Sequence, residues 1–108
     1  MTEKDASLDA AFSVNSLVMN GGLDHAFEVA GDQFHEAIQG FQLAGRLDIA
    51  ALLRAFLDVT GSQRVPDSME ARTALLMRLD ENSMQKIQDL VDAYDQLSDP
   101  REDIERVE

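Results

Sequence analysis

The sequence contains no cysteine and no tryptophan, and it has only 2 prolines. Without cysteine the chain cannot form disulfides, thiolate zinc sites or a cysteine nucleophile. Basic residues are also scarce, with 9 Lys and Arg against 21 Asp and Glu and a formal net charge of -12. Because nucleic-acid binders need cations to neutralise phosphates, this balance excludes direct binding to nucleic acid.

Long hydrophobic runs are missing as well. No apolar stretch approaches the roughly 18 residues of a membrane-spanning helix. The first residues do not combine a basic segment with an apolar one, as a secretory signal would. We therefore expect a cytoplasmic protein that makes no membrane contact, and no phosphate loop or other motif calls for a cofactor. With 108 residues, 44% of them hydrophobic, the chain can build one modest core.

Apolar residues recur at helical spacing, and no run alternates as a strand would. The sequence predicts an all-α, single compact domain of about five to six helices over residues 7–99. An N-terminal tail (1–6) precedes it and an acidic C-terminal tail (100–108) follows. That last segment either frays or docks through Ile104 and Val107. We expect Leu47, Met69 and Met84 to face the core.

One apolar seam repeats at alternating spacings of four and three residues; it consists of Leu23, Phe27, Ala30, Phe34, Ala37, Phe41 and Ala44. Such a seam fits one continuous helix or two helices with a bend at Gly31. We favour the bend, because Gly31 would cap one helix and Asp32 would begin the next. The phenylalanines are expected in the core; the alternative is that part of the seam forms the interface of a homodimer.

Three further patterns predict where helices begin and end. Asn20, Gly21 and Gly22 are predicted to form a structural turn that ends the first helix in a left-handed conformation. Asp67 is predicted to begin a helix as the first residue of a capping box. The last long helix is expected to begin at Asn82 or Ser83.

Residues 18–27 contain Asn-Gly-Gly, an aliphatic residue, a polar pair and an aromatic residue, in that order. Downstream come Gly31-Asp32, an acidic helix, Ala44-Gly45 and an alanine- and leucine-rich segment ending at Phe56. Over about residues 10 to 97 the chain resembles a family of small bacterial helical domains named for a DNA-mimic protein, the DMP type. The resemblance implies an all-α fold and no known catalytic activity. The name of the family implies mimicry of DNA.

The charge is unevenly distributed along the chain. Residues 1–44 carry seven acids and one base, residues 45–79 four acids and five bases, and residues 80–108 ten acids and three bases. The five bases of the middle segment either pair with acidic residues or leave a basic face; they are Arg46, Arg54, Arg64, Arg72 and Arg78.

The last long helix carries the acidic face of interest. We predict that a basic partner binds there, to Asp89, Asp92, Asp95 and Asp99. Steps of three or four residues rise about 4.5–6 Å along a helix, which is of the order of phosphate spacing in DNA. The alternative is an ordinary solvated face that keeps the protein soluble.

We therefore expect a non-enzymatic protein-binding module, a DNA mimic that occupies the basic nucleic-acid-binding surface of a partner such as a transcription regulator. The alternative is an immunity or antitoxin-like inhibitor of a basic nuclease or other toxin. A third reading is a metal-dependent enzyme using His25 and His35. A di-iron bundle needs two acid-x-x-His pairs, and only Asp32 and His35 form one, so we predict no metal ligands and no catalytic residues.

Overall fold

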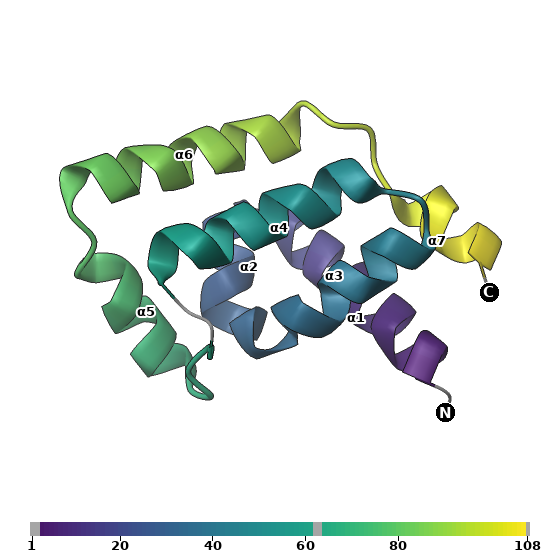
Figure 1. Cartoon of the computed structure of the whole chain (residues 1–108), viewed down its shortest axis with the longest axis horizontal. Helices are drawn as coiled ribbons and strands as arrows, with labels where there is room; N and C mark the ends of the chain where they lie inside the picture. Colours follow the sequence, from purple (N-terminus) through teal and green to yellow (C-terminus); the bar gives the residue numbers. More distant parts are fainter. Residues whose placement is uncertain (1–2, 62–63, 108) are drawn as a thin grey trace.

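The computed structural model describes residues 3–61 and 64–107, and in these ranges it contains helices and no strand (Figure 1). The all-α prediction is therefore confirmed. The elements are α1 (Glu3–Gly21), α2 (Leu23–Ala30), a 3-10 helix η1 (Gly31–Gln33), α3 (Phe34–Leu43), α4 (Leu47–Thr60), α5 (Met69–Met77), α6 (Glu81–Asp95) and α7 (Arg101–Val107).

Four helices pack in the order α1, α3, α4 and α6, so that α6 lies along the outside of the molecule (Figure 1). Helix α2 lies beside α1 and also contacts α5 and α6. Helix α5 packs chiefly against α2, at the end of the molecule opposite the two termini (Figure 1). Helix α7 contacts α1 and α3.

The core is built around four phenylalanines that are fully buried. Three of the rings meet one another, with centroids 5.6 Å apart for Phe27 and Phe34, 5.0 Å for Phe27 and Phe56, and 5.9 Å for Phe34 and Phe56. Phe41 lies on the same seam and is also 0% exposed. The seam is thus the intramolecular core, as predicted, and the alternative of a dimer interface formed by its phenylalanines is wrong.

The seam runs over two helices rather than one, with the predicted bend at Gly31. The predicted cause was right in part: Gly31 is the C-cap residue of α2, but its φ of -58° is not left-handed, and α3 begins after Gln33, without a side-chain cap, rather than at Asp32. Glycine is required there for space, because a Cβ atom would lie 2.6 Å from Cδ of Arg72.

Arg72 stabilises the bend from a distant part of the sequence. Its side chain is almost fully buried, and its guanidinium donates hydrogen bonds to the carbonyl oxygens of Glu28 (3.0 Å), Val29 (3.1 Å) and Pro66 (2.7 Å). The last carbonyls of a helix lack partners within that helix. Arg72 supplies partners at the end of α2 and at the same time fastens α5 to the body of the molecule.

Several predicted helix ends were displaced by one or more residues. Helix α5 begins after Ser68, whose hydroxyl accepts the Ala71 amide (3.1 Å), and not after Asp67. Helix α6 begins after Asp80, whose carboxylate accepts the Ser83 amide (2.7 Å). Several polar side chains stand next to each other at both sites, and the structure assigns the caps to Ser68 and Asp80.

Both ends of the chain contain more helix than predicted. Helix α1 begins at Glu3, inside the segment predicted as a tail over 1–6. In the acidic segment 100–108, α7 docks through Ile104, which is 1% exposed, so the fraying alternative is wrong for the described residues. Helix α1 ends at Gly21, and Gly22 has φ 94° and ψ 170°, a region open to glycine but not the left-handed helical conformation predicted.

Three residues expected in the core are instead on the surface: Leu47 is 65% exposed, and Met69 and Met84 are each 53% exposed. The buried face of α4 is turned toward Ile49 and Leu53 instead. Met69 is the first residue of α5 and Met84 lies in the first turn of α6, and α5 packs chiefly against α2.

Helices α1 and α3 approach each other closely at Gly40. A Cβ atom on Gly40 would collide with the backbone carbonyl of Ser7. We expect Gly40→Ala to lower the free energy of unfolding by about 1–3 kcal/mol, the usual effect of overpacking. The control is Gln42→Ala on the exposed side of α3, which should stay within about 0.5 kcal/mol of the parent. Urea unfolding followed by circular dichroism measures both, and equal stability of the two variants would contradict the close packing.

The role of Arg72 is tested by Arg72→Met. This change leaves carbonyls of Glu28, Val29 and Pro66 without their donor, and each buried unpaired group costs about 1–3 kcal/mol. We expect a loss of at least about 2 kcal/mol in urea unfolding. Arg78→Met, which removes an exposed arginine with no ion pair to a described acid, should leave stability unchanged. A loss of similar size in both variants would mean that total charge, and not the carbonyl contacts, is the cause.

Candidate partner-binding face

The outer helix α6 and its cap carry a concentration of negative charge. Residues 80–95 contain one base, Lys86, and five exposed acids: Asp80, Glu81, Asp89, Asp92 and Asp95. None of the five forms an ion pair with a cation in the described part of the chain. These carboxylates therefore remain available to cations from another molecule.

Two of the carboxylates are held in place by glutamines one turn earlier on the same helix. The side-chain amide of Gln85 donates to Asp89 and that of Gln88 donates to Asp92, both at 3.0 Å. Each bond engages one carboxylate oxygen. Because an arginine fork can bind a carboxylate at both oxygens or at one, the free oxygen of each group can still accept a hydrogen bond.

The acidic residues wind around α6 rather than forming a straight row. Successive steps of three residues rise about 4.5 Å and turn the side chain back by roughly 60°. Asp89 and Asp95 therefore point about 120° apart, with Asp92 between them. A partner that contacted all three would have to follow a curved path across the helix.

Asp99, the fourth residue predicted for this face, lies elsewhere. It follows the end of α6, and its carboxylate accepts hydrogen bonds from the Asn15 amide (3.2 Å) and the Arg101 backbone (3.0 Å), and pairs with the Arg101 side chain (2.7 Å). Burial raises its pKa, but these hydrogen bonds lower it by more, so the net pKa is below the usual value. The structure brings together Asp89, Asp92 and Asp95 and gives Asp99 contacts within the fold.

A buried polar contact fixes the position of α6. The Tyr94 hydroxyl donates to the side-chain oxygen of Asn15 (2.8 Å), and Asn15 is 0% exposed. Burial raises the pKa of Tyr94, so the hydroxyl keeps its proton at neutral pH. Asn15 thus links α1 to both α6 and the loop at Asp99. The sequence signal for this buried link is the amide side chain of Asn15, which stands among apolar residues on one face of α1.

Two arginines of the middle segment form ion pairs and side-chain hydrogen bonds with described residues. Arg46 pairs with Asp48 (3.1 Å) and Asp103 (3.0 Å) and also binds the Ser98 carbonyl (3.0 Å). The hydrogen bond from Arg46 is the main cause of the lowered pKa of Asp48. Arg72 lies 3.8 Å from Asp32 in addition to its carbonyl contacts.

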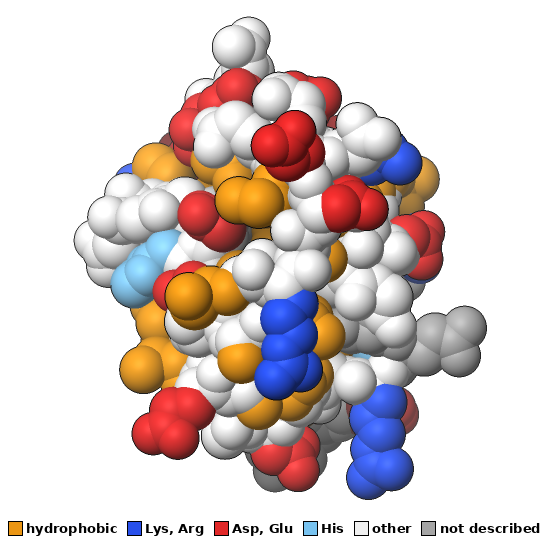
Figure 2. All heavy atoms as spheres, turned by 90° about the vertical axis from the view of Figure 1, so that its left-hand side faces the viewer, with side chains coloured by type: hydrophobic (Ala, Val, Ile, Leu, Met, Phe, Trp, Pro, Cys, Tyr) orange, Lys and Arg blue, Asp and Glu red, His pale blue; other side chains and the backbone are white. Residues whose placement is uncertain are grey.

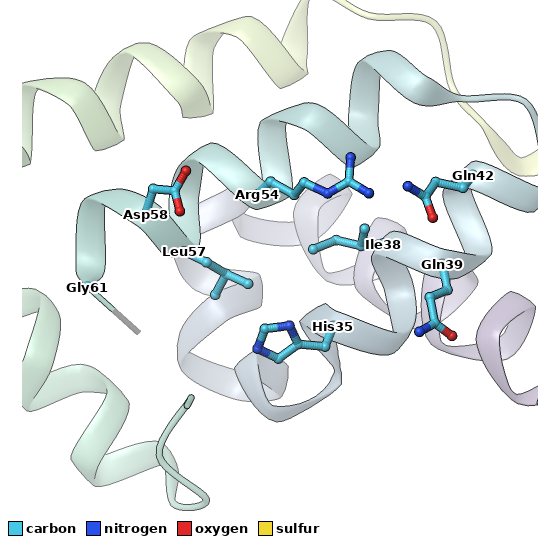
Figure 3. Close-up of a pocket in the computed structure, with 8 residues that line it drawn as sticks. All are labelled: His35, Ile38, Gln39, Gln42, Arg54, Leu57, Asp58 and Gly61. Atoms are coloured by element: carbon cyan, nitrogen blue, oxygen red, sulfur yellow. The ribbon is translucent and has the colours of Figure 1, made fainter. Parts of the chain in front are cut away.

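A hollow of about 600 Å³ lies between α3 and α4 (Figure 3). Arg54 extends across it toward Gln42, and His35 lies nearer the Gly61 end (Figure 3). Its ionisable lining residues are His35, Arg54 and Asp58.

The two histidines are on different helices. His25 packs against Gly21 at the start of α2, whereas His35 lines the hollow between α3 and α4. Among the described residues there is no group of three or more His, Asp or Glu side chains positioned to hold a metal ion. The predicted absence of a metal site stays a prediction, for which solution metal analysis is the test.

Residues 1–108 match the sequence model of one protein family, which is described as DMP19-like protein. Comparison with curated proteins and with solved structures gave no match. Across 3–61 and 64–107, every helix is too short or too polar to cross a bilayer.

The distinct role of Asp99 predicts an effect on stability that Asp92 lacks. Asp99→Ala leaves the buried Asn15 amide without an acceptor and should cost about 1–2 kcal/mol of unfolding free energy. Asp92→Ala should change it by less than about 0.5 kcal/mol. Urea unfolding at neutral pH measures the difference between the two variants.

The contribution of Asp99 to the stability of the fold should depend on pH. Because folding lowers the pKa of Asp99, its contribution to stability is complete above the unfolded-state value of about 3.9 and is lost as pH falls through the folded-state value. The difference in unfolding free energy between wild type and Asp99→Ala should therefore become smaller below about pH 4. A difference that increased as the pH was lowered would contradict this assignment.

Proposed function

This chain belongs to the DMP19-like family, and we propose that it is a non-enzymatic module that binds a basic protein through the outer face of α6. The partner is a DNA-binding regulator whose cationic surface the carboxylates of Asp89, Asp92 and Asp95 occupy in place of DNA phosphates. The observation that carries this proposal is that all three carboxylates are exposed and have no ion pair with a described cation.

The positions of the cations also support the proposal. Arg46 and Arg72 are turned toward α7 and α2, and Arg101 pairs with Asp99 beyond the end of α6. The binding face keeps only Lys86 as a cation on its own helix. A surface of one sign attracts an oppositely charged partner, raises its rate of association and makes binding sensitive to salt.

The anchoring of α6 favours a fixed array over a flexible acidic segment. Asp80 caps the start of the helix and Tyr94 ties its last turn to α1. Preorganised charges lose less entropy when a partner binds. An acidic chain that served only for solubility would not require its carboxylates to be held in a defined order.

We expect the combined change of Asp89, Asp92 and Asp95 to Asn to weaken partner binding at least about tenfold, which corresponds to about 1.4 kcal/mol. Asp99 is kept, so the contact with Asn15 remains. The partner is first isolated with tagged wild-type protein and a salt gradient. Its release from fluorescent DNA by wild type and variant is then measured by anisotropy.

The matched control changes Glu3, Asp9 and Glu36 to their amides, which removes the same number of charges from α1 and α3. If both variants lose the same share of their ability to release the partner from DNA, net charge alone explains the effect. That result would contradict a specific binding face on α6. If the partner binds no DNA and is instead a nuclease or toxin whose activity is blocked, the DNA-mimic proposal is wrong and the inhibitor alternative is correct.

A further inference from the structure

A second surface lies where α5, α6 and α2 meet. An open groove of about 250 Å³ there is lined by Leu76, Leu79 and Ile87, with Met77 and Met84 beside them. Figure 2 views this end of the molecule, where hydrophobic side chains reach the surface among acidic and basic ones.

The methionines of this groove are unusually exposed for large apolar side chains. Met77 is 79% exposed and Met84 is 53% exposed. Large contiguous patches of exposed apolar surface mark sites of interaction, whereas single exposed apolar residues are ordinary. Methionine is flexible and polarisable, so such a groove can adapt to apolar side chains of different shapes.

The charges of the groove define what can occupy it. Its charged lining residues are both acidic, Asp24 and Glu28, and neither has an ion pair with a cation in the described ranges. Gln88 also lines the groove, and it donates to Asp92 on the outer face of α6. The groove is therefore an apolar strip with acidic groups beside it, and it is continuous with the acidic face.

We infer that this groove binds an amphipathic basic helix of the partner protein, with leucine-like side chains on one face and Lys or Arg beside them. Helical partners of this kind insert apolar anchors at i, i+4 and i+7 into a groove between helices. A second copy of this chain is the less suitable occupant, because its net charge of -12 would place acid against acid. The inference rests on the proposed function only in taking the partner to be basic.

The test uses a fluorescent synthetic helix of about 14 residues, roughly four turns, with leucine at i, i+4, i+7 and i+11 and lysine elsewhere. A scrambled peptide of the same composition removes the apolar stripe and keeps the charge. Wild-type protein should bind the amphipathic peptide at least about tenfold more tightly than the scrambled one. Equal binding of the two peptides, or no binding of either, would overturn the inference.

The groove is identified by the double change of Met77 and Met84 to Gln, which should weaken peptide binding at least about tenfold. Both side chains are exposed, so the fold should persist, and circular dichroism checks this. The matched control changes the exposed Met19 and Leu47 to Gln, on α1 and α4, and should bind as wild type does. If both double variants bind the peptide equally well, the groove is not the site and the inference fails.

The triple variant Asp89→Asn, Asp92→Asn, Asp95→Asn distinguishes failure of the groove inference from failure of the proposed function. If it keeps peptide binding but no longer releases the regulator from DNA, both the groove and the acidic face are supported. If it loses peptide binding while the methionine variant retains it, the inference is overturned and the proposed function is unaffected. If the wild-type protein binds the peptide through the groove but displaces no regulator, the inference stands and the proposed function fails.

Discussion

The buried guanidinium of Arg72 determines the arrangement of one whole end of the molecule. Its bonds to the carbonyls of Glu28 and Val29 end α2, and its bond to Pro66 fixes the chain before α5. Since α5 packs chiefly against α2, this contact holds α5 in place at this end of the molecule. The methionine-lined groove lies there, between residues of α2, α5 and α6.

A chain with a net charge of -12 repels itself when it becomes compact. The structure counters this with neutral and cationic contacts placed inside or between elements. Arg46 joins α4 to α7, and Asn15 joins α1 to Tyr94 and Asp99. These links lie away from the exposed side of α6, where Asp89, Asp92 and Asp95 have no ion pair with a cation in the described ranges.

Helix α6 is the element on which both proposals meet. Its outer side carries Asp89, Asp92 and Asp95, and the side facing α2 and α5 contributes Met84 and Ile87 to the groove. Gln88 belongs to both surfaces. An acidic face supplies long-range attraction, which speeds association, while apolar contacts act only at short range and slow dissociation. A partner that used both would therefore bind quickly and remain bound.

The sequence by itself determined the helical class, the core position of Phe27, Phe34 and Phe41, and the acidity of the last long helix, because spacing and composition are local properties. It predicted the bend and the cap at Gly31, but not the close contact there with Arg72, which comes from another helix. Only the tertiary structure decided that Asp99 leaves the acidic face, that Asn15 is a buried link, and that Met77 and Met84 are exposed. A side chain of given spacing can face core or solvent, and the elements packed against it decide which.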